Sequence, residues 1–227
     1  LVDSFFFAEA ERAGETEAMH PTILLNTTNH LALRGAVSEA SASELVRAAL
    51  TAAQTPSYLY LDTGGGDVMA GQRIIQLVVQ LQLICIVFRA YSMGFAILQH
   101  CRHRWVLPGA TLMQHPMSVT FSGPVRRSQE YVNMALRLSQ SMNRVQAERL
   151  GVSVAWFLNR TASDWWMEDT QALQHRCADT HVHVTCTRAL ALRNVTRTEE
   201  VGLLAGVVIP GQQRVYSACP LVAQALE

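Results

Sequence analysis

The feature that constrains this chain most is a repeated order of buried strand, turn and helix. An apolar run at Tyr58–Leu61 leads into a glycine-rich turn and then into a helical pattern over residues 68–82. A second apolar run, Ile84–Phe88, leads into a turn at Ser92 and a further helical pattern that starts at Met93. This alternation predicts a mostly parallel sheet with right-handed crossovers, and therefore an α/β fold.

The other elements are predicted from local signals. Ser41 and Glu44 form an S-x-x-E capping box, which predicts that a helix begins there. Gly151 is a favourable residue just beyond a helix end. The further expected elements are a strand over 30–37, strands over 104–107 and 111–116 separated by a turn at Pro108-Gly109, a long helix over 126–150, short helices over 154–158 and 168–177, a strand over 181–186, and strand or loop pieces to the end, clearest at 206–211.

The amino-acid composition excludes several classes of function. The 227 residues suffice for one sizeable core, and 18 basic residues balance 18 acidic ones, so nothing indicates a nucleic-acid partner. All of the basic residues are arginine, which excludes Ser–Lys dyads, Schiff bases and lysine-dependent phosphate loops. No apolar run reaches the ~18 residues of a membrane span.

Cysteine and histidine usage predicts neither a disulfide framework nor a metal site. The five cysteines are odd in number, scattered and without a C-x-x-C pair, which favours a reducing compartment. His181 and His183 share one face of an expected strand, but no third ligand is evident. We therefore expect no metal and no cofactor.

Ser92 is a candidate nucleophile because it lies between an apolar strand and a helix. Such a turn exposes the serine hydroxyl beside the free N–H groups of a helix start, which can stabilise an oxyanion. The nucleophile-elbow pattern G-x-S-x-G is incomplete, because Ala90 stands where the first glycine belongs. The alternative interpretation is that Ser92 only caps the helix.

Three further features follow strands or lie in loops, where the sites of parallel sheets gather. Gly64–Gly66 requires unusual backbone angles or allows close approach, His115 ends a strand before a proline, and Asp164 lies in a loop. Taken alone, His115 has a structural alternative and Asp164 is an ordinary loop acid or helix cap. Together with Ser92 they supply the serine, histidine and aspartate that nucleophilic acyl transfer needs.

The ordered motifs resemble those of the ClpP family, the proteolytic subunits of Clp proteases within the ClpP/crotonase superfamily. The similarity runs from about His30 to about Asp179. It is carried by Leu33-Arg34-Gly35-Ala36-Val37, by Tyr58 to Gly66, by Ala70-Gly71, by Tyr91-Ser92-Met93-Gly94, by Arg104, Leu107, Pro108, Met113 and His115, and by Ala162 to Glu168.

This resemblance implies the roles of individual residues. Ser92 would be the nucleophile, His115 the general base and Asp164 the orienting acid. The backbone N–H groups of Gly66 and Met93 would form the oxyanion hole. His103 in place of His115, or Asp169 in place of Asp164, would overturn this assignment.

The resemblance also implies an architecture and partners. We expect a β-α-β superhelix, or spiral, with a protruding handle helix at 126–150, assembled into two stacked heptameric rings of this chain or related subunits. Unfolded polypeptides would be the substrates, and a hexameric AAA+ unfoldase would dock at a cleft that Tyr60 lines, unless Tyr60 is only a core aromatic. The expected setting is the mitochondrial matrix or plastid stroma, alternatively the bacterial cytoplasm.

We divide the chain into an irregular arm over residues 1–22, a peptidase domain over 23–180 and a C-terminal extension over 181–227. Several positions depart from the family pattern. Gly64 replaces a proline, Tyr91 replaces a small residue and is expected to crowd the substrate, and Arg176 replaces a glycine. These departures keep open a weakly active or purely structural subunit of a mixed ring. A third interpretation is an acyl-CoA enzyme of the crotonase type, which would need acidic residues around a thioester site and no serine–histidine pair.

Overall fold

The structure is a computed structural model that describes residues 20–118, 123–198 and 213–222. Its centre is a six-stranded sheet in the order β2-β3-β4-β5-β6, with β7 also paired to β5. The strands are β2 (His30–Arg34), β3 (Tyr58–Thr63), β4 (Ile84–Tyr91), β5 (Arg104–Gln114), β6 (Trp165–Glu168) and β7 (Thr180–His181). All neighbours are parallel except β5 and β6, so the predicted α/β class and mostly parallel sheet are confirmed.

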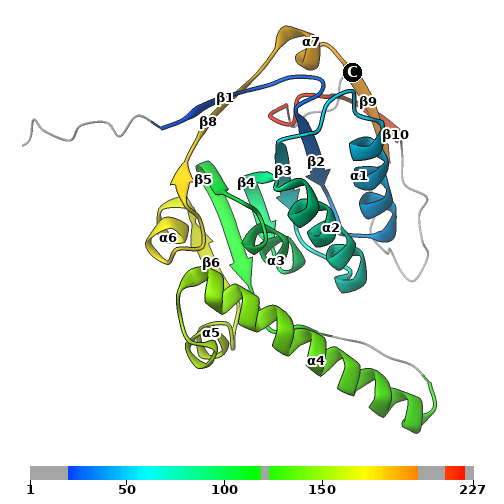
Figure 1. Ribbon diagram of the computed structural model, residues 1–227, viewed down its shortest axis with the longest axis vertical. Coiled ribbons are helices and arrows are strands. Elements are labelled where there is room, and N and C mark those ends of the chain that lie inside the picture. The colour runs from blue at the N-terminus through cyan, green and yellow to red at the C-terminus, as the bar shows by residue number, and fades with distance from the viewer. Residues whose placement is uncertain (1–19, 119–122, 199–212, 223–227) are drawn as a thin grey trace, which may run out of the picture.

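Helices between the strands bury the core against the sheet. Figure 1 shows α1 (Glu39–Thr51), α2 (Val68–Leu81) and α3 (Met93–Gln99) gathered beside the parallel strands. Every residue of α3 is buried, which matches a sequence that is apolar up to its last residue, the polar Gln99. The helix predicted over 68–82 agrees with α2, while α1 begins earlier than predicted, because Ser38 is its cap and Ser41 closes the capping box at the third position.

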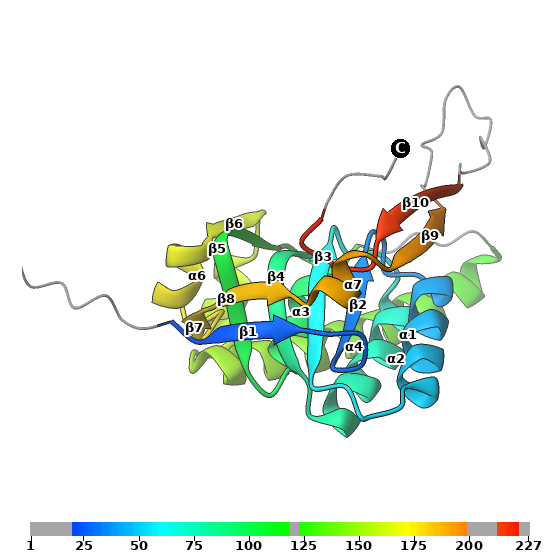
Figure 2. The same cartoon turned by 90° about the horizontal axis from the view of Figure 1, so that it is seen from above.

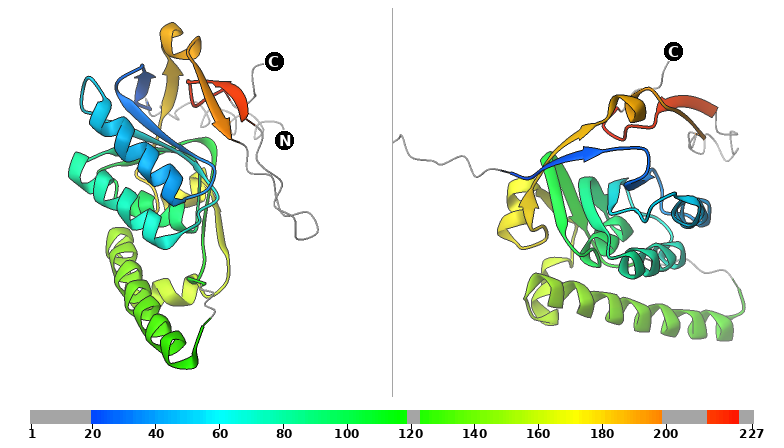
Figure 3. Two further views of the ribbon diagram at one scale, coloured as in Figure 1. Left: turned by 90° about the vertical axis from the view of Figure 1, so that its right-hand side faces the viewer. Right: turned by 45° about the horizontal axis from the view of Figure 1, so that its top comes forward.

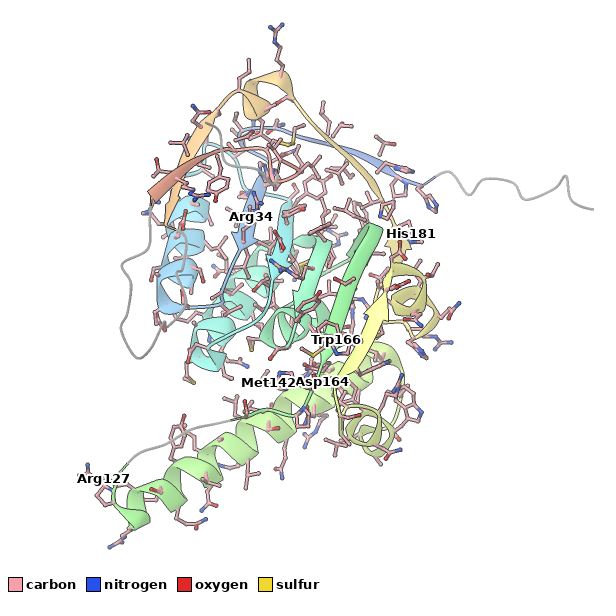
Figure 4. The ribbon with its side chains drawn as sticks, turned by 180° about the vertical axis from the view of Figure 1, so that it is seen from behind. Arg34, Arg127, Met142, Asp164, Trp166 and His181 are labelled. Atoms are coloured by element: carbon pink, nitrogen blue, oxygen red, sulfur yellow. A yellow bond between two sulfur atoms is a disulfide. The ribbon has the colours of Figure 1, made fainter. Side chains whose placement is uncertain are left out.

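The longest helix, α4 (Val125–Leu150), projects from the sheet layer. Figures 1 and 3 show it along one end of the molecule, and Figure 4 labels Arg127 at its outer tip. It ends at Gly151, whose φ of 73° closes the helix in the left-handed conformation, as predicted. The shorter helices α5 (Val154–Arg160) and α6 (Asp169–Gln174) flank β6.

A smaller layer lies at the end of the molecule opposite α4, as Figures 1 and 3 show, and Figure 2 shows its strands β1 and β8 side by side. In it β1 (Thr22–Leu25) runs parallel to β8 (His183–Cys186), and β9 (Asn194–Thr198) runs antiparallel to β10 (Gln213–Ser217), with the short helix α7 (Arg188–Ala191) between β8 and β9. The predicted strand over 181–186 is thus split between β7 and β8. The predicted piece over 206–211 lies outside the described residues.

One predicted turn is absent. Pro108-Gly109 was expected to separate two strands, but β5 runs unbroken through both residues. Its pairing with β4 shifts register between Val87 and Arg89, so the extra residues are taken up as a bulge rather than as a turn. A proline fits such a position because the ladder hydrogen bond is already interrupted there.

The prediction that no disulfide framework exists is wrong. Cys85 is joined to Cys101, Cys186 is joined to Cys219, and Cys177 is a free, buried thiol. Spacing could not reveal these pairs, because the partners come from different elements that only the fold brings together. No helix within the described residues is long and apolar enough to cross a membrane.

The predicted domain boundaries stay predictions. Residues 1–19 of the expected N-terminal arm lie outside the described residues, and β1 starts at Thr22. The expected boundary between residues 180 and 181 falls inside β7, which pairs with β5 of the main sheet.

Candidate active site

Ser92 occupies a sharp turn between β4 and α3. Its backbone angles, φ 53° and ψ −115°, lie in a region that non-glycine residues rarely adopt. Ser92 precedes the first helical residue, yet its side chain makes no capping hydrogen bond. The hydroxyl is therefore directed to another partner, and the simple capping interpretation does not account for the strained backbone.

His115 is that partner. It follows the last residue of β5, and its Nε2 lies 2.8 Å from Ser92 Oγ, so the hydroxyl can donate its proton to an unprotonated ring nitrogen. The Ser92 N–H also donates to the Met113 carbonyl at 2.8 Å, which fixes the serine turn against β5. The other histidine considered, His103, instead stacks on Trp105 with a centroid separation of 6.1 Å.

Asp164 lies next to His115 in the strand pairing. The last pair between antiparallel β5 and β6 is Gln114 with Trp165, so positions 115 and 164 face each other one step beyond it. Figure 4 shows Asp164 where β6 begins, close in that view to Met142 of α4. Its side chain is exposed, and no hydrogen bond joins it to His115 among the described residues.

The competing acid, Asp169, has other partners. Its carboxylate accepts a hydrogen bond from the Gly109 N–H at 2.8 Å and lies 3.3 Å from His181 Nε2. Burial opposes ionisation of Asp169, but these two groups and the Thr170 N–H outweigh it and hold the pKa of the carboxyl below its ordinary value. Asp169 thus anchors the bulge of β5 to α6 rather than the histidine at the site.

The two predicted oxyanion donors lie beside Ser92. Met93 provides the first N–H of α3, and Gly66 lies in the glycine loop, which pairs with Val37 through the N–H groups and carbonyls on either side of Gly66. Neither N–H has an acceptor among the described residues. Gly66 has a φ of 144°, which only glycine adopts readily, so its identity shapes the loop at this point.

A pocket opens next to the serine. Its apolar surface comes from Val68, Met117 and Met142, and the complete lining is Gly66, Val68, Ser92, Met93, Gln114, His115, Met117, Ser118, Ser139, Met142, Asn143 and Gln146. Tyr91 is not among these residues. It hydrogen-bonds Thr111 at 2.8 Å and packs edge-on against Trp166, so the expected crowding of this pocket by Tyr91 is not observed.

Sequence reasoning missed the contribution of α4 to this pocket. Gln146 is buried and accepts a hydrogen bond from Gln114 Nε2 at 2.5 Å, which ties the helix to the end of β5. Met142 and Gln146 are one helical turn apart, so they share a face of α4. That spacing was the available signal, but it resembles any buried helix face.

Tyr60 of β3 lies in a second hollow, which shares no lining residue with the pocket next to Ser92. The hollow is called the docking groove after the partner docking that the resemblance implies for Tyr60, which stays a prediction. It is lined by Arg34, Tyr60, Asp62, Phe88, Leu107, Pro108, Val182, His183, Val184, Pro220 and Leu221. Tyr60 itself is buried, and burial together with the Asp62 carboxylate raises the pKa of its hydroxyl to about 12. Asp62 in turn pairs with Arg34 and Arg89.

An ion pair between buried Arg104 and partly exposed Asp179 lies at the far end of β5. Arg104 donates from Nε and Nη2 to Asp179, and a further nitrogen donates to the Gln99 side chain at 2.6 Å. Burial opposes ionisation of Asp179, but hydrogen bonds from Arg104 and the charges of Arg104 and Arg149 lower its pKa overall. Arg176, the residue that replaces a family glycine, has a φ of 57° just before this aspartate.

No group of three or more metal-binding side chains that could hold an ion occurs within the described ranges. His181 and His183 are separated into different strands, and His20 packs against both rings.

In a comparison with protein families, the model described as Clp protease matches residues 13–182, which is well over half of the chain.

Proposed function

The chain belongs to the Clp protease family, and from this we propose that it is a serine endopeptidase that uses Ser92, His115 and Asp164. The family supports a peptidase; the identity of the catalytic residues is our proposal. The observation that carries it is the 2.8 Å contact between Ser92 Oγ and His115 Nε2 at a strained strand-to-helix turn. Strain of this kind persists where the surroundings hold a residue in a functional position.

The proposed reaction is acyl transfer to the serine. As Ser92 Oγ attacks the peptide carbonyl carbon, its proton passes to His115 Nε2, and the carbonyl oxygen gains negative charge. The N–H groups of Gly66 and Met93 donate to that oxygen. His115 then gives the proton to the leaving amine, and a water repeats the sequence to release the acyl group from Ser92.

Asp164 would hold the histidine during this cycle. Because position 164 faces position 115 across the β5–β6 pair, a rotation of its exposed side chain can bring the carboxylate toward Nδ1. A carboxylate there fixes the tautomer that leaves Nε2 free to accept a proton, and it stabilises the imidazolium that forms. We propose that this rotation accompanies assembly or substrate binding.

The pocket and the handle suggest how substrates are selected. Val68, Met117 and Met142 favour an apolar side chain next to the bond that is cut. On α4, Val132, Met134 and Leu136 expose apolar side chains that suit an interface with another subunit. We propose stacked rings that admit unfolded polypeptides, supplied by a hexameric AAA+ unfoldase at the docking groove.

A second candidate is a weakly active or structural subunit of a mixed ring. The missing hydrogen bond between Asp164 and His115 among the described residues favours it. Hydrolysis of a short fluorogenic peptide by the purified chain and by Ser92→Ala separates the two. Turnover that requires Ser92 supports the peptidase. A folded, assembled chain without any turnover supports the structural subunit.

A further inference from the structure

The C-terminal segment of the chain forms one wall of the docking groove. Pro220 and Leu221 line it together with Tyr60, Phe88 and Leu107. Pro220 is buried, whereas Phe88 remains 47% exposed and Leu221 37% exposed. A partner side chain that enters the groove must therefore share it with Pro220 and Leu221 of the chain itself.

This segment is attached at its base by a covalent bond. Cys219 immediately precedes Pro220 and is joined to Cys186 at the end of β8, a strand whose residues also line the groove. The Ala218 N–H donates to the Arg193 carbonyl at 2.6 Å and the Ser217 hydroxyl to the Ala191 carbonyl at 2.7 Å. These contacts fix the approach of the segment to the groove.

Beyond Cys219 the attachment is weak. The Val222 carbonyl accepts one long hydrogen bond, 3.4 Å, from Arg34 Nη1, and the Val222 N–H donates to the Cys219 carbonyl at 3.2 Å. Leu221 and Val222 are both exposed. Two hydrogen bonds of this length contribute little against the entropy of ordering three residues. The position of residues 220–222 therefore depends on how firmly Cys219, the residue before them, is held.

We propose that residues 220–222 are a strap across the docking groove and that the Cys186–Cys219 disulfide is its latch. With the latch closed, the tether keeps Pro220 and Leu221 at a high effective concentration beside the apolar groove. With the latch open, the strap leaves and the full groove is exposed. If the groove receives the unfoldase, as the proposed function holds, oxidation restricts docking and reduction permits it.

The switch requires a dithiol reductant of the thioredoxin type. One thiolate of the reductant attacks a sulfur of the disulfide, its second thiolate releases the mixed disulfide, and the reductant ends as a disulfide itself. Two electrons and two protons arrive at Cys186 and Cys219, which become thiols. The residues before the strap stay attached through the β9–β10 pairing, and the strap itself is held only by the two Val222 hydrogen bonds and by the apolar groove.

The test compares the full-length chain with Cys219→Ser under oxidising conditions, where Cys85–Cys101 stays intact. Hydrogen exchange followed by mass spectrometry reports the strap, and bis-ANS fluorescence reports exposed apolar surface. In Cys219→Ser we expect the Ala218 and Val222 amides to exchange about tenfold faster, and bis-ANS fluorescence to rise several-fold. Cys177→Ser, which removes the free thiol, is the matched control and should change neither.

A second substitution locates the exposed surface. Adding Phe88→Ser to Cys219→Ser should abolish most of the gained fluorescence while exchange of the strap stays fast. Unchanged hydrogen exchange of the strap in Cys219→Ser would overturn the proposal, and so would a gain in bis-ANS fluorescence that persists when Phe88→Ser is added. Hydrolysis of short peptides by Cys219→Ser and by Cys177→Ser should equal that of the parent chain, so a failure of the peptidase proposal is recognised separately from a failure of the strap proposal.

Discussion

Gly65 and Ser92 pack so closely that a side chain on the glycine has no room. A Cβ added to Gly65 would lie 2.8 Å from the Ser92 Cβ and 2.7 Å from the Tyr91 carbonyl oxygen. The glycine loop after β3 and the serine turn after β4 are therefore one rigid unit. Their contact sets the position of the Gly66 N–H relative to the serine.

Gly65→Ala should accordingly damage both stability and activity. The residue has a φ of 91° in addition to the steric conflict, so we expect a loss of ~2 kcal/mol or more in unfolding free energy and a fall in peptide hydrolysis. Gly64→Ala is the matched control, because a Cβ there meets nothing within 4 Å. Urea denaturation and peptide assays measure both effects. Equal behaviour of the two variants would contradict the packing argument.

The roles of the two candidate acids differ in a way that amide substitution separates. Asp164→Asn should lower kcat by up to ~10⁴-fold, because an amide opposite His115 stabilises the wrong tautomer. Asp169→Asn should leave kcat within a few-fold, because its partners are Gly109 and His181. Steady-state kinetics on a fluorogenic peptide measure both. Loss of activity in Asp169→Asn alone would reverse the assignment.

The Asp179–Arg104 pair predicts a specific acid sensitivity. The folded-state pKa of Asp179 is lowered, so its stabilisation is complete above the unfolded-state value of about 4 and is lost as pH falls toward the lower folded value. Asp179→Asn should lower the unfolding free energy at pH 7 by about 1 kcal/mol, because the carboxylate is partly exposed and solvent screens the ion pair. It should also make the remaining stability less dependent on pH below about 4. Urea denaturation at a series of pH values tests this. An unchanged acid dependence would contradict the assignment.

The exposed apolar side chains of the handle helix α4 predict that subunits associate through it. Leu136 on α4 is 54% exposed in the single chain, and Leu136→Glu would place a charge in the proposed interface. In sedimentation velocity we expect Leu136→Glu to form smaller assemblies than the parent chain does. Leu192→Glu is the control, because Leu192 is 70% exposed just after α7, at the other end of the molecule. Equal sedimentation of parent and Leu136→Glu would contradict an interface through the handle.

The sequence predicted those parts of the fold that local pattern determines. Apolar runs and glycine positions located α2 and the end of α4, and their alternation predicted the parallel sheet. The ordered motifs assign Ser92 and His115 to one site, and the two side chains lie 2.8 Å apart in the structure. The prediction of a turn at Pro108 is wrong, because the pairing with the neighbouring strand determines whether such a residue forms a turn or a bulge.

The remaining features depend on contacts between distant segments. The Cys186–Cys219 bond joins β8 to the residue before the strap, and nothing in the spacing of the cysteines pairs them. The docking groove likewise combines strands with residues near the chain end. The expected reducing compartment stays a prediction, and it would keep the latch open.

The most direct test of the account is labelling with a fluorophosphonate, which reacts with an activated serine hydroxyl and not with ordinary serines. Intact-mass analysis of the native full-length chain should show one adduct, and peptide mapping should place it on Ser92. His115→Ala should slow labelling by orders of magnitude, and Ser92→Ala should abolish it. Labelling at another serine, or no labelling of a folded and assembled chain, would contradict the assignment of Ser92 as the nucleophile.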